Sequence, residues 1–129
     1  MAKVIKVVLM AILLVGCAST ETVKQEKGEG DKRLFEHGYD AVFDASLVVA
    51  GKQELEVVEQ DRDSGTIMLS HGVTLWSWGE RIAVFVTKVS ASQTEVEIIS
   101  RAVMAPLNFP PDWVNRIFDG ITKELDSSG

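Results

Sequence analysis

The chain has 129 residues, a length that fits one domain with a modest hydrophobic core. Hydrophobic residues make up 46% of it and charged residues 25%, a composition that excludes disorder along most of the chain. The 19 acidic residues exceed the 13 basic ones and give a net charge of −6. Such a surface repels the phosphate backbone of DNA or RNA, so the sequence predicts no nucleic-acid partner.

Residues 1–16 have the pattern of a targeting signal. Lys3 and Lys6 form a positive segment, and the apolar run VVLMAILLV follows at 7–15. This run is too short for a transmembrane helix, which needs about 20 apolar residues, but it suits the core of a signal peptide. We therefore predict a signal peptide over residues 1–16.

The only cysteine of the chain, Cys17, follows this apolar run directly after Gly16. The motif Leu14-Val15-Gly16-Cys17 resembles the bacterial lipobox, the recognition sequence of lipoprotein signal peptidase. The resemblance implies that the Cys17 thiol carries diacylglycerol, that the chain is cut before Cys17, and that the new N-terminus is acylated, for example with palmitate. The alternative is a buried structural cysteine in an ordinary signal or core helix.

Lipidation of Cys17 implies attachment to a membrane of the cell envelope. Each buried methylene group contributes about 0.8 kcal/mol, so several acyl chains hold a domain on a bilayer persistently. Ala18, rather than Asp, follows the cysteine. In lipoproteins of two-membrane bacteria this residue favours the outer membrane over the inner one, so the resemblance implies an outer-membrane location facing the periplasm. Without a second cysteine, no intramolecular disulfide can form.

Residues 17–34 are predicted to combine the lipidated Cys17 with a flexible tether. The stretch ASTETVKQEKGEGDKR, residues 18–33, mixes charges of both signs with two glycines and has Val23 as its aliphatic residue. It offers too little apolar surface to order itself. A tether of this kind would let the domain reach partners near the membrane.

Residues 35–129 are predicted to form one α+β domain that begins near Leu34. Its first element is a helix between His37 and Gly51, in which apolar residues recur at helical spacing. Strands are predicted at 54–61, 66–70, 81–90 and 95–103, and the stretch RDSG at 62–65 has turn chemistry. A closing helix is predicted from Asp112 to Leu125, with an apolar residue at every fourth position.

Strands joined by short turns imply an antiparallel meander, and the two amphipathic helices must cover one of its faces. We expect a two-layer α+β fold, helix–four-strand antiparallel meander–helix, with both helices on one face of the sheet. In strand 81–90, Ile82, Val84 and Val86 are predicted on one face, and Ala83, Phe85 and Val89 on the other. One buried cluster is expected to join both helices to the sheet, formed by Phe43, Val84, Phe85, Ile98, Trp113, Ile117 and Ile121.

This order of elements resembles BamC-like helix-grip domains of the outer-membrane assembly machinery and other families of envelope lipoproteins. The likeness covers residues 36–127 and depends on the apolar periodicity and on the acidic turn DRDSGTI at 61–67. It carries no catalytic residues to transfer. Because the chain has one such domain, the resemblance does not imply membership of the assembly complex.

The sequence contains no convincing catalytic or metal-binding motif. His37 and His71 are the only histidines and are not in HExxH spacing, so we expect no metal site. The acidic turn begins like a calcium loop, but Arg62 interrupts it and the closing Glu is missing near His71. Ser70 precedes His71 without a nucleophile elbow, which argues against a hydrolase. We expect no enzymatic activity and no cofactor.

Trp76-Ser77-Trp78, between Gly72 and Gly79, is the most unusual motif. In an extended chain both indoles point to the same side. One interpretation is a strand whose tryptophans cover the sheet or fill the core. The other is an exposed aromatic platform, with Trp76 and Trp78 binding a protein partner, a glycan or an apolar ligand.

Together these features predict a lipid-anchored, non-enzymatic interaction module of the cell envelope, with an envelope protein as its partner. The alternative is a carrier in which the helices hold a small apolar ligand against the sheet. A hollow core would favour the carrier, whereas a filled core with an exposed patch would favour the interaction module.

Overall fold

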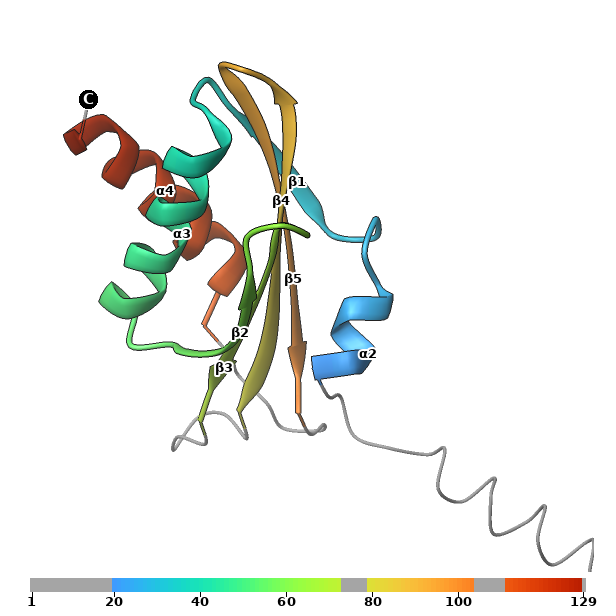
Figure 1. The fold of residues 1–129 in the computed structure, drawn as a ribbon. Coiled ribbons are helices and arrows are strands. Elements are labelled where there is room, and N and C mark those ends of the chain that lie inside the picture. Colours follow the sequence, from blue (N-terminus) through green and yellow to red (C-terminus); the bar gives the residue numbers. More distant parts are fainter. Residues whose placement is uncertain (1–19, 73–78, 104–110, 129) are drawn as a thin grey trace, which may run out of the picture.

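The computed structural model describes residues 20–72, 79–103 and 111–128. Within them the elements follow in the order α2 (Thr20–Gln25), β1 (Asp31–Phe35), α3 (Tyr39–Lys52), β2 (Glu56–Asp61), β3 (Thr66–His71), β4 (Glu80–Ser90), β5 (Gln93–Ala102) and α4 (Trp113–Ser128). Figure 1 shows the helices arranged around one sheet. The α+β class and the antiparallel sheet are as the sequence predicts.

The sheet has the strand order β1-β5-β4-β3-β2, and each neighbouring pair is antiparallel. At one end His71 pairs with Glu80, which pairs in turn with Ala102. We call this the β3–β4 end. The turn between Ser90 and Gln93 joins β4 to β5 at the opposite end, which we call the β4–β5 end.

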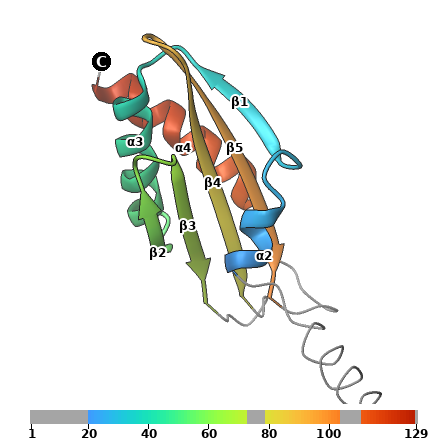
Figure 2. The same cartoon turned by 45° about the vertical axis from the view of Figure 1, so that its right-hand side comes forward.

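Both faces of the sheet are covered, by different helices, so the predicted two-layer arrangement is wrong. α3 and α4 lie on one face, and α2 lies on the other (Figures 1 and 2). The alternation predicted for β4 is confirmed over residues 82–86. Ile82, Val84 and Val86 belong to the main core beneath α3 and α4, whereas Ala83 and Phe85 belong to a second core beneath α2.

The main core joins α3 and α4 to the sheet, as predicted. It contains all but one of the expected residues: Phe43, Val84, Ile98, Trp113, Ile117 and Ile121. Phe85 is buried too, but in the second core, so the prediction of a single cluster is wrong for this residue. The reason is strand geometry, because Phe85 follows Val84 and must point to the opposite face.

α4 begins one residue after Asp112, whose side chain caps it. Asp112 Oδ1 accepts a hydrogen bond from the backbone N–H of Asn115 at 3.2 Å, and Oδ2 accepts one from the Asn115 side chain at 2.6 Å. These bonds to Asn115 lower the pKa of the Asp112 carboxyl.

α3 and α4 approach closely at Gly120, where a Cβ would lie 2.6 Å from Cγ1 of Val49.

The structure corrects the prediction for residues 17–34. α2 and β1 both fall within this range, so a flexible tether is wrong from Thr20 onward, and the sheet has five strands rather than four. Val23 of α2 is 0% exposed and packs in the second core. The segment alone has too little apolar surface to fold, but the sheet supplies the rest of that core: Met68, Ala83, Phe85 and Ile99.

A buried carboxylate fastens the segment between α2 and β1. Glu97 of β5 is 4% exposed, and its oxygens accept hydrogen bonds from the backbone N–H of Gly28 at 2.8 and 2.9 Å and of Gly30 at 2.9 Å. Gly28 has φ +101°, and a Cβ on Gly30 would lie 2.6 Å from the carbonyl oxygen of Ile98. The glycines of the predicted tether therefore form a turn that binds a carboxylate.

Removing this segment should weaken the domain. We expect a chain that starts at Leu34 to be less stable than one that starts at Ala18 by at least about 2 kcal/mol, because it exposes Phe85 and Ile99 and leaves Glu97 without its donors. Urea unfolding followed by circular dichroism measures the difference.

Two substitutions distinguish the effect of losing the Glu97 carboxylate from the effect of removing residues 18–33. Glu97→Ala in the longer chain should lower the free energy of unfolding, whereas Glu95→Ala, a change at a half-buried carboxylate on the same strand, should have a smaller effect. Equal stability of the chain that starts at Ala18 and the chain that starts at Leu34 would contradict the assignment of residues 20–33 to the fold.

Candidate functional site

The predicted site residues Cys17, Trp76 and Trp78 lie outside the described residues, so their placement stays a prediction. The structure does describe the chain next to them. Thr20 begins α2 three residues after Cys17, and Gly72 and Gly79 stand at the β3–β4 end of the sheet. The described residues of the β3–β4 end therefore form the candidate site.

A histidine–glutamate pair closes the β3–β4 end. Nδ1 of His71, the last residue of β3, lies 2.8 Å from Oε2 of Glu80, the first residue of β4. The Glu80 side chain is 0% exposed and that of His71 is 19% exposed. The cross-strand register places these two residues opposite each other, so the contact depends on strand pairing rather than on sequence proximity.

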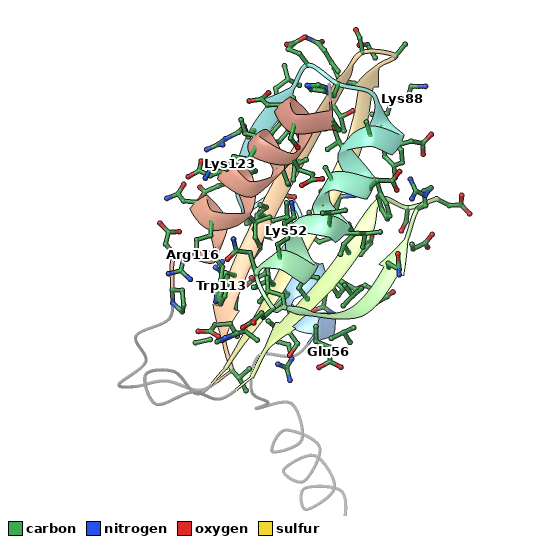
Figure 3. The ribbon with its side chains drawn as sticks, turned by 90° about the vertical axis from the view of Figure 1, so that its left-hand side faces the viewer. Lys52, Glu56, Lys88, Trp113, Arg116 and Lys123 are labelled. Carbon is green, nitrogen blue, oxygen red and sulfur yellow. The ribbon has the colours of Figure 1, made fainter. Side chains whose placement is uncertain are left out.

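Trp113 joins α4 to this pair. Its ring is tilted against the imidazole of His71 with centroids 4.8 Å apart, and the guanidinium of Arg116 lies 5.5 Å from the centre of the Trp113 ring. Figure 3 shows Trp113 and Arg116 at the start of α4. The buried Nε1 of Trp113 has no hydrogen-bond acceptor among the described residues.

The arrangement does not form a nucleophile–base pair. Ser70 and His71 are adjacent in β3, so their side chains point to opposite faces of the sheet. Ser70 Oγ accepts a hydrogen bond from Arg81 at 2.8 Å, while His71 contacts Glu80 and Trp113. In the described part of the chain, no group of three or more His, Cys, Asp or Glu residues could hold a metal ion.

The acidic turn is a structural element that docks on α3. The Arg62 guanidinium lies 3.0 Å from Asp40 Oδ1, also bonds Asp44, and stacks over the ring of Phe43 at 4.4 Å. The hydroxyl of Tyr39 donates a hydrogen bond to the Arg62 carbonyl. The bond to Asp44 raises the pKa of Arg62, and burial raises the pKa of Tyr39.

Asp61 confirms the predicted turn chemistry at the same place. Its Oδ1 accepts the backbone N–H of Asp63 at 3.0 Å, which is the pattern of a local turn. Arg62, the residue that interrupts the calcium-loop pattern, thus fixes the turn to α3 through its side chain.

The grooves of the described surface lie outside the main core. An open groove of about 540 Å³ borders the acidic turn, with Lys27, Tyr39, Asp63 and Lys88 in its wall. A smaller one of about 280 Å³ runs between α3 and α4 beside Lys52 and Lys123, both labelled in Figure 3. Among the described residues, the side chains between these helices and the sheet are buried and form the main core.

Comparison with known proteins gives distant structural likenesses. No protein-family model and no curated protein matches the chain. The di-domain ARO/CYC BexL from the BE-7585A biosynthetic pathway is similar over 75% of this chain with 18% identity and a TM-score of 0.45, and the match spans 43% of that protein. Ara h 8.0201 is similar over 76% of this chain and 93% of its own, with 14% identity and a TM-score of 0.45. These values assign neither a family nor a ligand to this chain.

The His71–Glu80 contact should be a stabilising one. We expect His71→Ala to lower the free energy of unfolding by about 1–3 kcal/mol, because it removes a partner of a fully buried carboxylate and leaves space beside Trp113. Urea unfolding measures the loss.

His37→Ala is the matched control. The carbonyl of His37, rather than its ring, bonds Thr94, so the substitution keeps that hydrogen bond. An equal effect of the two histidine substitutions would show that the His71–Glu80 contact adds nothing specific to stability.

Proposed function

We propose that this chain is a lipid-anchored cell-envelope protein, held at the outer membrane facing the periplasm, whose domain acts as a non-enzymatic interaction module. The observation that carries the proposal is the order of features before the domain. Lys3 and Lys6 precede an apolar run that ends in the lipobox-like sequence LVGC at 14–17. None of the described helices is both long and apolar enough to cross a membrane.

The packing of the described part of the main core supports an interaction module over a carrier. A carrier needs room for a ligand between the helices and the sheet, and in the described residues buried side chains from α3, α4 and the strands pack together there. An interaction module needs only an outer surface. The proposed partner is an envelope protein, and the proposed binding residues are Trp76 and Trp78.

The separation of Ser70 and His71 on opposite sheet faces supports the non-enzymatic part of the proposal. The resemblance to BamC-like helix-grip domains also stays part of it. That resemblance rests on the order of helix, strands and helix, which runs here from α3 through β2–β5 to α4.

Cys17→Ser tests the anchor. The substitution should abolish incorporation of radiolabelled palmitate and leave an uncleaved precursor, because the thiol that accepts the lipid is gone. Ser19→Ala, two residues beyond the cysteine, is the matched control and should be labelled and cleaved normally. Palmitate entering the Cys17→Ser protein would overturn the lipobox assignment.

The double substitution Trp76→Ala, Trp78→Ala tests the binding site. If these indoles bind a partner, the variant should keep most of its stability and lose the proteins captured with it from solubilised membranes. Iodide quenching of indole fluorescence, corrected for Trp113, measures their accessibility in the free domain.

Trp113→Ala is the control for loss of fold. Trp113 lies in the main core, so its truncation should lower the free energy of unfolding by about 3–5 kcal/mol and reduce capture through unfolding. A double variant that unfolds in the same way, with both indoles inaccessible to iodide, would remove Trp76 and Trp78 from the proposed binding site.

A further inference from the structure

We propose that the domain sits directly on the lipid bilayer in one orientation. The side that carries α2, together with the β3–β4 end of the sheet, faces the lipid headgroups. The β4–β5 end and the layer formed by α3 and α4 face away. This inference rests on the proposed lipidation of Cys17 and adds to it the face of the domain that meets the membrane.

The first step is the length of chain between the anchor and the fold. Cys17 is three residues before Thr20, where α2 begins. An extended chain spans at most about 3.6 Å per residue, so the Cα atoms of Cys17 and Thr20 lie within about 11 Å of each other. A flexible tether of the predicted length, residues 18–33, would instead extend up to about 58 Å, with a root-mean-square end-to-end distance of about 22 Å, and would impose no orientation.

The second step is the position of α2 along the sheet. Val23 packs in the second core with Met68, Ala83, Phe85 and Ile99. Met68, Ala83 and Ile99 are paired across β3, β4 and β5. Ala83 is three residues from the start of β4 and seven from its end. At about 3.4 Å per residue, Ala83 therefore lies about 10 Å from the β3–β4 end and about 24 Å from the β4–β5 end. Figure 1 shows α2 beside the half of the sheet nearer the β3–β4 end.

The third step is the attachment of α2, which is fixed at several points. Lys24 Nζ lies 2.8 Å from Glu59 Oε1 of β2, and Arg101 Nε of β5 lies 3.0 Å from Glu26 Oε2. The Glu97 carboxylate holds the turn that follows through its bonds to the glycine N–H groups. Contacts with two strands, β2 and β5, made by α2 and by the residues just after it, together with the buried Val23, define both the position and the direction of the short helix.

The bilayer must then lie on the α2 side. Three helical residues add about 4.5 Å, so Cys17 lies within about 15 Å of Val23, which is less than the distance from Ala83, in the same core, to the β4–β5 end. α3 and α4 are separated from α2 by the whole sheet (Figures 1 and 2). A lipid layer that receives the acyl chains of Cys17 thus meets the α2 side and the β3–β4 end first.

Depth-dependent quenching tests the orientation with the full-length lipidated protein in vesicles of phosphatidylethanolamine and phosphatidylglycerol. Acylation leaves no free thiol on Cys17, so one introduced cysteine takes a fluorophore. Suitable positions are Gly72→Cys at the β3–β4 end, Ser92→Cys at the β4–β5 end and Val48→Cys on α3, all at exposed residues. Gly72 also has nothing within 4 Å of a Cβ.

With nitroxide-headgroup lipids in the vesicles, the label at Gly72→Cys should be quenched at least threefold more than those at Ser92→Cys and Val48→Cys. Val23→Asp, which places a charge at a fully buried position, should release α2 and abolish this difference while the protein stays on the vesicles. The matched control Val58→Asp, at a valine that is 50% exposed, should keep the difference.

Two kinds of failure are distinguishable. Equal quenching at the three positions, or stronger quenching at Ser92→Cys or Val48→Cys, in protein that is bound to vesicles would overturn the orientation and leave the anchor intact. Failure of the protein to bind vesicles, or labelling of Cys17 in a chain without an introduced cysteine, would overturn the lipidation and the orientation with it.

Discussion

The N-terminal part of the domain depends on the hydrogen bonds between the buried Glu97 carboxylate of β5 and the backbone of Gly28 and Gly30. The carboxylate accepts three hydrogen bonds from the backbone N–H groups of Gly28 and Gly30, and Glu97 itself is 4% exposed. By fixing this turn it sets the start of β1 and the position of α2. Val23 can then cover the second core, and the sheet becomes a middle layer between α2 and the pair α3 and α4.

Apolar periodicity predicted α3, α4 and the strands from β2 to β5, because each of these elements has a clear apolar side in its own sequence. It missed α2 and β1, because Val23 is the only aliphatic residue between Thr20 and Arg33 and the packing surface belongs to other strands. The sequence of β4 nevertheless contains a signal for the layer that α2 forms. β4 carries apolar residues on both faces, among them Ala83 and Phe85, and a strand that is apolar on both faces indicates a second covering layer.

The candidate site shows the same division between local and long-range information. The RDSG turn was predictable because Asp61 bonds the backbone two residues away. The pair of His71 and Glu80 was not, because it depends on the register between β3 and β4 and on the start of α4 above it. Ser70 and His71 are neighbours in the sequence, but strand alternation places their side chains on opposite faces of the sheet.

The short distance between Cys17 and α2 changes what an anchored interaction module can do. If Cys17 is lipidated as proposed, a long tether would let the domain sample a volume of the periplasm, whereas about 11 Å of chain would confine it to the membrane surface. Confinement raises the effective concentration of any partner held at the same membrane, because both then search a layer rather than a volume. A partner reached across the periplasm gains nothing from this arrangement. On the proposed lipidation of Cys17, the short link favours an envelope protein attached to the same bilayer, met beside the β3–β4 end, where Gly72 and Gly79 flank Trp76 and Trp78 in the sequence.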